Sequence, residues 1–335
     1  MMRKIGRRLL WAVFVIWATV SLAFVVNNVL PSDPARMVAG PQARPKEVEK
    51  IRLQLGLNKP LYEQYGIFLR RLVHFGPTHP TAQDPVHGSC ANLGPLHFDL
   101  GTSYQQRRPV ITILAERLPR TVLLALVAVL LQVLFGVSTG TLAAAKKRTF
   151  LDHGTVTLTL IGISMPTFVL GLLLQFVFAH RLRWLPLDGY GQSAGEHMVS
   201  VILPALTLGI FGAAYYTRLV RDELLGIEGQ DHVRTARAKG LSNLRVWTHH
   251  LLRNALAPLV TVVGLDLGAL VGGAIVTETL FRWPGIGALS VAALLDRDGP
   301  VILGTVLLAS TSVVLSNLLV DASYALLDPR VRRRR

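Results

Sequence analysis

The stretch Thr121-Val-Leu-Leu-Ala-Leu-Val-Ala-Val-Leu-Leu-Gln-Val-Leu-Phe-Gly-Val-Ser-Thr-Gly-Thr-Leu-Ala-Ala-Ala145 contains no charged residue. A helix needs about 20 consecutive apolar residues to cross a hydrocarbon core roughly 30 Å thick, so this stretch is long enough to span a bilayer. Five further stretches have a similar length. Four of them carry no charge: 9–32, 154–179, 198–217 and 300–320. The fifth, 255–280, is apolar except for Asp266 and Glu278. We therefore predict an all-α integral membrane protein with six transmembrane helices.

The overall composition agrees with this prediction. Of the 335 residues, 51% are hydrophobic and 16% are charged, whereas soluble domains carry about 25% charged residues. The 35 Lys and Arg residues outnumber the 20 Asp and Glu residues, which gives a formal charge of +15. Nucleic-acid binders share such a charge but not so apolar a chain, so we expect no nucleic-acid partner. The single cysteine, Cys90, excludes an intramolecular disulfide and a multi-cysteine metal site.

The positions of the basic residues predict the orientation in the membrane. Nineteen of the 35 lie in four segments on one side of the predicted spans: 3–8, 146–148, 218–253 and 330–335. Lys and Arg are enriched in cytoplasmic loops, so we expect both termini in the cytoplasm of a multi-pass protein of the bacterial inner or plasma membrane. The apolar run 9–32 exceeds the length of a signal-peptide core and is interpreted as a retained anchor.

The first extracytoplasmic loop, 33–118, is too long to be a simple connection. Its patterns predict short helices over 45–56 and from Leu61 to Leu72, followed by an irregular segment over 76–97. Four histidines accompany Cys90 here, but their spacing matches no ligand pattern, so we interpret the segment as a histidine-rich surface loop and expect no metal site: His74, His79, His87 and His97. A later apolar stretch, 284–295, is too short to span and predicts a lid or a partner-facing half-helix.

The segment 221–254, on the predicted cytoplasmic side, is expected to form a compact pair of helices. Gly240 is suited to end the first in the left-handed conformation, and Ser242 is suited to cap the second. On the second helix, Leu244, Trp247 and Leu251 are expected to share one face. Both ends of the segment are tethered to membrane spans, which argues against a DNA-reading helix-turn-helix.

At this segment the sequence resembles the dipeptide/oligopeptide (peptide/nickel) branch of the ABC-transporter permeases. The matching residues are Val233-Arg-Thr-Ala-Arg-Ala-Lys-Gly-Leu-Ser242 and His250-Leu-Leu-Arg-Asn-Ala-Leu-Ala-Pro258, which are similar to that family's EAA loop. Further similar motifs follow the family's order along nearly the whole chain: Leu53-Gln-Leu-Gly-Leu57, Asp99-Leu-Gly-Thr-Ser-Tyr104, Arg117-Leu-Pro-Arg-Thr121, Gly285-Ile-Gly287 and Leu327-Asp-Pro-Arg330. The chain departs from the pattern in a longer segment at 76–97 and in an arginine tail at 332–335, which we interpret as an anchor to anionic membrane lipid.

The resemblance implies a type I ABC importer permease fold and a complex in which transport and ATP hydrolysis belong to different chains. It implies a non-catalytic permease subunit that forms the translocation path for dipeptides, oligopeptides or related small solutes. The implied partners are a second homologous permease, two ABC ATPases that bind ATP and Mg, and an extracytoplasmic substrate-binding protein. The loop residues that would couple to the ATPases are Val233, Arg234, Thr235, Ala236, Arg237, Ala238, Lys239, Gly240, Trp247 and Leu251.

Several residues keep two interpretations at this point. Asp266, near the middle of the fifth span, either lines the path and meets a peptide amino group or is a hydrogen-bonded residue at the interface between permease subunits. Gly240 either permits close approach of a partner or simply caps a helix. The loop basic residues either pair with partner carboxylates or are solvated. Glu278 is expected to cap or position the half-helix that follows. Pro166 and Pro204 are expected to kink their spans, and Gly268, Gly272 and Gly273 to allow close packing.

We divide the chain into a cytoplasmic N-terminus with the first helix (1–32), the extracytoplasmic loop (33–118), a five-helix core (119–326) and a basic tail (327–335).

An ion-coupled secondary transporter is the alternative function, with Asp266 and Glu278 as coupling carboxylates. It predicts internal repeats, which the sequence does not display. The sequence contains no Walker A motif and no hydrolase or metalloprotease motif, so no cofactor, metal or enzymatic site is expected in this chain.

Overall fold

The computed structural model describes the chain except for residues 1, 30–33, 41, 55, 77–89 and 328–335. The described residues form two compact units, and each unit is described by itself. Unit 1 comprises residues 1–119 and 285–314, and unit 2 comprises residues 120–284 and 315–335. The predicted arginine tail and the residues His79 and His87 lie outside the described residues.

Unit 1 contains a long N-terminal helix, several short elements of the first loop, and one short helix near the C-terminal end. In chain order these are α1 (Met2–Val29), α2 (Pro34–Ala39), α3 (Pro45–Gln54), α4 (Leu61–Leu72), β1 (His74–Phe75), β2 (Ala91–Leu93), β3 (Leu96–Phe98) and α14 (Ile286–Leu295). Two long helices run from one unit into the other, α5 (Val110–Ala145) and α15 (Gly299–Leu327). The predictions of α3, α4 and a short helix at 284–295 are confirmed.

Aromatic side chains attach α4 to α1. The ring of Phe24 stacks on Phe68 with centroids 5.2 Å apart and contacts Tyr65 at 5.3 Å. The hydroxyls of Ser21 and Tyr65 share a hydrogen bond of 2.6 Å. The first loop therefore contains a helix, α4, that is packed against the first span.

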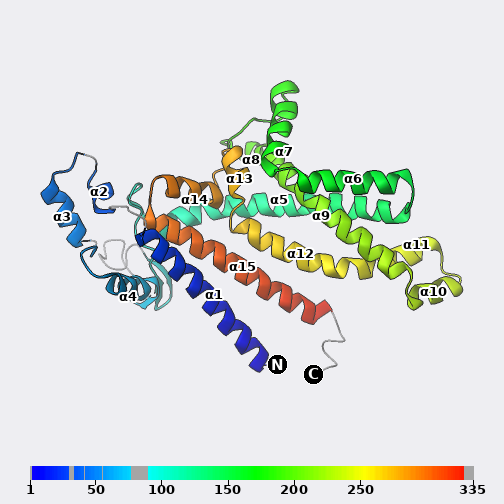
Figure 1. The fold of residues 1–335 in the computed structure, drawn as a ribbon, viewed down its shortest axis with the longest axis horizontal. Coiled ribbons are helices and arrows are strands. Elements are labelled where there is room, and N and C mark those ends of the chain that lie inside the picture. The colour runs from blue at the N-terminus through cyan, green and yellow to red at the C-terminus, as the bar shows by residue number, and fades with distance from the viewer. Residues whose placement is uncertain (1, 30–33, 41, 55, 77–89, 328–335) are drawn as a thin grey trace. The chain divides into compact units, whose positions relative to one another are not determined.

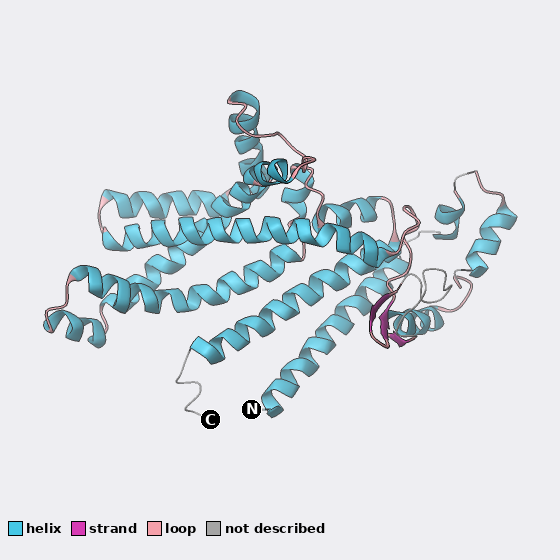
Figure 2. Ribbon diagram, turned by 180° about the vertical axis from the view of Figure 1, so that it is seen from behind, coloured by secondary structure: helices cyan, strands magenta, loops and turns pink. Residues whose placement is uncertain are grey.

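A three-stranded antiparallel sheet follows α4, in the order β1-β3-β2 (Figure 2). His74 of β1 pairs with His97 of β3, and Asn92 of β2 pairs with the same residue from the other side. The prediction of an irregular segment over 76–97 is therefore wrong for the strand residues. Strands of two or three residues are too short to leave the alternating pattern by which a strand is recognised in a sequence.

A buried carboxylate organises the core of unit 1. Asp298, just before α15, is 3% exposed and accepts hydrogen bonds from Ser103 Oγ at 2.5 Å, Tyr104 N at 3.1 Å and Gln105 N at 3.3 Å. Burial, and secondarily the charge of Asp298, raises the pKa of the Tyr104 hydroxyl above its ordinary value. The apolar core beside it joins the start of α5 to α14 and α15 through Val110, Ile113, Leu114, Ile286, Leu289, Ala293 and Val301.

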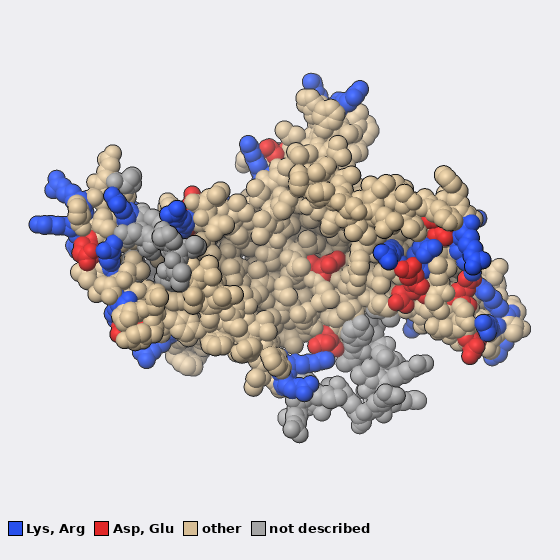
Figure 3. Space-filling view, viewed as in Figure 1, with Lys and Arg blue, Asp and Glu red and all other residues tan. Residues whose placement is uncertain are grey.

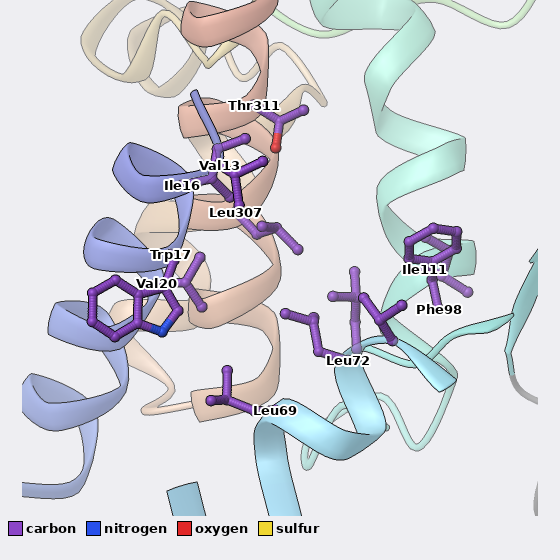
Figure 4. A pocket seen from close by; sticks show the side chains of 12 residues that line it. Val13, Ile16, Trp17, Val20, Leu69, Leu72, Phe98, Ile111, Leu307 and Thr311 are labelled. Atoms are coloured by element: carbon purple, nitrogen blue, oxygen red, sulfur yellow. The ribbon is translucent and has the colours of Figure 1, made fainter. Parts of the chain in front are cut away.

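Unit 1 also contains an apolar cavity of about 560 Å³ (Figure 4). Side chains of α1, α4 and α15 line it, among them Trp17, Leu69 and Leu307, and Thr311 supplies the one hydroxyl of the lining. Such a lining suits hydrocarbon rather than the charged ends of a peptide.

Unit 2 holds the remaining helices, and its long helix α9 packs against α6, α12 and the unit 2 part of α5 (Figure 1). In chain order the elements are α6 (Phe150–Ser164), α7 (Thr167–Leu174), the π-helix η1 (Gln175–Arg181), α8 (Ala194–Ser200), α9 (Ile202–Glu228), α10 (Asp231–Ala238), α11 (Asn243–Arg245), the π-helix η2 (Val246–Leu252), α12 (Arg253–Val271) and α13 (Ile275–Leu280).

Two of the predicted spans are interrupted. Pro166 precedes α7, where the direction of the chain changes by 104° between 150–164 and 167–181, so the predicted kink is confirmed and is a full break. The stretch 255–280 divides where α12 ends at Gly272 and Gly273 adopts φ +122°. Close packing at these glycines stays a prediction; in the structure they end α12, and Gly273 adopts a positive φ that glycine tolerates. By length and apolarity, the described part of the chain has four helices able to cross a membrane, or up to six if each of two bent pairs is one span: 150–164 with 167–181, and 243–256 with 258–271.

Glycines bring α5 and α9 into close contact. A Cβ atom on Gly136 would lie 2.3 Å from Tyr216 Cβ, and one on Gly140 would lie 2.6 Å from the carbonyl oxygen of Thr217. The Thr139 and Thr217 hydroxyls hydrogen-bond at 2.6 Å between the same two helices. The spacing Gly-x-x-x-Gly is typical of helix pairs that pack backbone to backbone in membranes.

Candidate functional site

The loop that resembles a coupling element forms a helix with a left-handed end. After α10, Leu241 N donates to Ala236 O at 3.3 Å and Gly240 N donates to Arg237 O at 3.0 Å, the two bonds of a Schellman cap. Gly240 has φ +76°, which confirms the predicted left-handed conformation. No described atom outside its immediate chain neighbours lies within 4 Å of the position that a Cβ would take on Gly240, so its side-chain position faces open space.

The inner face of this loop packs into its own chain. Val233 and Ala236 of α10 are buried, and they belong to one cluster with Leu224 and Ile227 of α9. On the second helix of the loop, Val246 and Leu251 join the same cluster. Three of the residues predicted to couple, Val233, Ala236 and Leu251, therefore anchor the loop to α9.

The second helix differs from the predicted α-helix because residues Val246–Leu252 form a π-helix. Hydrogen bonds in a π-helix join residues five apart, which places Val246 and Leu251 on one face. The prediction that Leu244, Trp247 and Leu251 share a face is wrong: Leu244 is 76% exposed, Leu251 is 1% exposed, and Trp247 is half-buried at the edge of the cluster. Ser242 does stand at the N-cap position, and its carbonyl oxygen accepts from Val246 N at 3.0 Å, but its side chain makes no capping hydrogen bond.

The outer face of the loop is exposed and carries charged side chains (Figure 3). The predicted coupling residues that lie on this face are Arg234, Thr235, Arg237, Ala238, Lys239 and Gly240. Together with the exposed Leu244 they form a surface, which we call the outer loop face, of basic, small and apolar groups.

Glu228, at the end of α9, links the loop to a second connection of unit 2. Its carboxylate lies 3.1 Å from Arg237 Nη2 and 2.6 Å from Lys147 Nζ, which follows α5. Arg237 thus has a carboxylate partner inside its own chain, whereas Arg234 lies 3.9 Å from the exposed Asp231. Sequence reasoning missed Glu228 because Lys147 is 81 positions away along the chain.

A second ion pair lies near the same end of unit 2. Arg221 of α9 contacts Asp152 of α6 at 2.6 and 3.1 Å through two nitrogens, and the main-chain nitrogen of Arg148 donates to the same carboxylate at 2.9 Å. Paired N–H···O bonds of this kind fix an arginine in orientation as well as in distance. They hold α6 against α9 beside the loop.

Asp266 has a partner within its own chain. Tyr216 Oη donates a hydrogen bond of 2.8 Å to Asp266 Oδ2, between α9 and α12. Tyr216 is completely buried and belongs to the same cluster as Val233, Ala236 and Leu251. One continuous apolar cluster therefore extends from the inner face of the loop to the residue that holds Asp266.

Glu278 lies in α13 and is completely buried. Its carboxylate accepts a hydrogen bond of 3.0 Å from Thr121 Oγ1 of α5, and its carbonyl oxygen accepts one of 2.8 Å from Trp283 N. The Trp283 indole in turn donates to Arg120 O at 3.1 Å. Glu278 therefore fixes α13 and the turn after it to α5.

Comparison with known proteins identifies the chain. The profile of the binding-protein-dependent transport system inner membrane component matches residues 136–333, and the profile of the N-terminal part of these membrane components matches residues 1–125. The glutathione transport system permease protein GsiC of Escherichia coli (strain K12) is 38% identical over 332 residues, which are 99% of each chain. A Brucella abortus (strain 2308) chain named for a peptide transport system permease is 38% identical over 329 residues, 97% of this chain and 98% of that one.

A solved structure of the MetNI methionine ABC transporter, in an inward-facing conformation, shares the fold. Its matching chain has a TM-score of 0.53 and 17% identity, and the match covers 65% of this chain and 97% of that one. The chain belongs to the family of binding-protein-dependent transport system inner membrane components, and it is a multi-pass permease component of an ABC importer with the type I permease fold.

Proposed function

We propose that this permease carries peptides or small peptide-like solutes, and that its 231–254 loop couples transport to ATP hydrolysis on partner chains. The substrate class is supported by the relatives named for peptide and glutathione transport. The substrate-binding protein would help to determine which solute of that class is carried. The ion-coupled alternative is set aside because the chain belongs to a family of ABC importer permeases.

The coupling proposal rests on one observation: one face of the loop is exposed and the other is buried against the rest of the chain. Its outer loop face is exposed, while Val233, Ala236 and Leu251 belong to the buried cluster that also contains Tyr216. Close-packed interiors transmit displacement rather than absorb it. A pull on the outer loop face by an ATPase would therefore move α9 and α12 together with the loop, and with them the Tyr216–Asp266 pair.

The proposed complex contains this chain, a second homologous permease, two ATPases that bind ATP and Mg, and a substrate-binding protein. The distribution of Lys and Arg supports cytoplasmic termini and a cytoplasmic 231–254 loop. The arrangement assigns ATP hydrolysis to the partner chains and leaves this chain non-catalytic. Lys239 and Arg234, on the outer loop face, are the basic residues proposed to meet partner carboxylates, because Arg237 pairs with Glu228.

Asp266 is proposed to lie beside the translocation path. It is partly exposed in this single chain, and its hydrogen bond to Tyr216 fixes one carboxylate oxygen. The other oxygen could accept from a substrate amino group or from the second permease, so these two roles need separate measurements. The apolar cavity of unit 1 lacks the polar groups expected of a peptide path.

The substitution Gly240→Asn tests the coupling role. Asparagine tolerates the left-handed conformation, so this change preserves the helix cap while it adds bulk to the outer loop face. Gly189→Asn is the matched control, because Gly189 also has positive φ (+93°) and open space around its Cβ position. In the assembled transporter, we expect Gly240→Asn to lower ATP-driven uptake at least tenfold while the control keeps it. Unchanged uptake and unchanged substrate-stimulated ATPase activity in Gly240→Asn would refute the coupling assignment.

A further inference from the structure

Three metal-ligating side chains of the first loop come together in unit 1. His74 of β1, Cys90 just before β2, and His97 of β3 each present one ligand atom, and these atoms all lie within 4.8 Å of one another. The residues are 16 and 7 positions apart along the chain, which is why their spacing in the sequence indicated no ligand pattern. The antiparallel sheet brings them together, because His74 and His97 are direct cross-strand partners.

The distances suit a tetrahedral ion. Cys90 Sγ lies 3.8 Å from His74 Nε2, and the two imidazole rings have centroids 5.6 Å apart. For a zinc ion with Zn–S of about 2.3 Å and Zn–N of about 2.0–2.1 Å, tetrahedral angles place S and N about 3.6 Å apart. A side-chain movement of a few tenths of an ångström would therefore complete this pair of bonds.

A hydrogen bond orients the His74 ring in the way that is common for histidines that bind metals. Its Nδ1 lies 2.9 Å from the carbonyl oxygen of Arg71. A carbonyl oxygen only accepts hydrogen bonds, so Nδ1 carries a proton, and in the neutral ring the lone pair is on Nε2, the atom that faces Cys90. A ligating histidine commonly donates its other ring N–H to a carbonyl oxygen in this way.

The strands of the sheet are very short, with two or three residues each. Isolated short strands are marginally stable and depend on further packing, so a bound ion would add to their stability. His97 is completely buried, while His74 and Cys90 are partly exposed, which leaves an entry path for an ion. An ion bound here would join β1, the residue before β2, and β3.

We propose that His74, Cys90 and His97 bind one Zn²⁺ ion that clips together the small sheet of the first loop. A thiolate and two imidazoles favour zinc over the hard cations Mg²⁺ and Ca²⁺, which prefer oxygen ligands. The three protein ligands leave one coordination position for water or a further donor. The inference is independent of the substrate and of the coupling role of the cytoplasmic loop.

The first experiment uses the unmodified, full-length chain without a histidine tag. Because Cys90 is the only cysteine, the rate of alkylation by a thiol reagent reports on its thiol alone. We expect Zn²⁺ to slow the alkylation at least tenfold and Mg²⁺ to leave it unchanged. Equal alkylation rates with and without micromolar Zn²⁺ would overturn the proposal.

The second experiment measures metal binding directly. We expect one Zn²⁺ per chain, and a Co²⁺ complex with a thiolate charge-transfer band in the near ultraviolet. Cys90→Ser, His74→Gln and His97→Gln should each weaken Zn²⁺ binding by about 100-fold or more, since loss of an outer partner alone costs 10–100-fold. His153→Gln is the control, because His153 Nδ1 also donates to a carbonyl oxygen, that of Thr149, at 2.8 Å. Binding that the control and the three ligand variants share equally would show an ion bound elsewhere and would refute the site.

Discussion

Tyr216 Oη donates a hydrogen bond of 2.8 Å to Asp266 Oδ2, and this bond joins α9 to α12. Tyr216 is completely buried, so the bond is shielded from water on the tyrosine side. A hydrogen bond to a charged group contributes about 1.5–3 kcal/mol to stability. Asp266 is therefore held in one position whether or not a substrate meets it.

Variants of this pair separate the two roles of Asp266. Tyr216→Phe should lower the free energy of unfolding by about 1–3 kcal/mol, because it leaves a carboxylate oxygen without its donor. Asp266→Asn keeps an acceptor oxygen for Tyr216 and should keep assembly, so a loss of uptake in this variant indicates a role in the path. The measurements are thermal unfolding, co-purification of the subunits and uptake. If Asp266→Asn left both assembly and uptake intact, neither the path nor the interface role would stand.

The pair Glu228–Arg237 should stabilise the loop only weakly. Its atoms are 3.1 Å apart, but the Arg237 side chain is 43% exposed, and exposed ion pairs contribute about 0–1 kcal/mol. A double-mutant cycle with Glu228→Gln and Arg237→Gln should give a coupling energy below about 1 kcal/mol that shrinks with added salt. A larger, salt-insensitive coupling energy would mean that the loop depends on this pair more than on its buried cluster.

The α5–α9 contact should tolerate no side chain at Gly136. A Cβ there would lie 2.3 Å from Tyr216 Cβ, so Gly136→Ala should separate the helices and cost about 1–3 kcal/mol of unfolding free energy. The matched control is Gly154→Ala on α6, where no described atom outside the immediate helix lies within 4 Å of the Cβ position. Because alanine is the better helix former, this change should be neutral or stabilising by up to about 1 kcal/mol. Thermal unfolding in detergent compares the two, and equal effects would contradict the packing argument.

Asp298 should be needed for the fold of unit 1. Its carboxylate accepts from Ser103, Tyr104 and Gln105, and Asp298→Ala would leave these donors without their acceptor, of which the Ser103 hydroxyl is buried. A buried unsatisfied group costs about 1–3 kcal/mol, so we expect a loss of about that size. Asp298→Asn keeps one acceptor oxygen and should lose less. If the Asp298→Ala and Asp298→Asn variants both unfolded at the wild-type temperature, the loop would be held by other contacts.

The sequence by itself determined the features that depend on neighbouring residues. Six apolar stretches predicted the spans, proline and glycine marked the ends of α3 and the break before α7, and Gly240 marked a left-handed helix end. These are local properties, because the hydrophobicity of a segment and the allowed φ of a residue are set by the segment and the residue themselves. The order of the family's motifs along the chain was likewise readable from the sequence.

Only the tertiary structure decided which residues meet across long separations. It turned Leu251 inward and Leu244 outward through a π-helix, paired Glu228 with Lys147, and brought Cys90 beside His74. No periodicity in a sequence specifies such contacts, because they depend on how helices and strands distant in the chain pack against one another. The histidines of the first loop show this most clearly: as a sequence they had no ligand spacing, and as a folded sheet two of them and Cys90 form a candidate site for one ion.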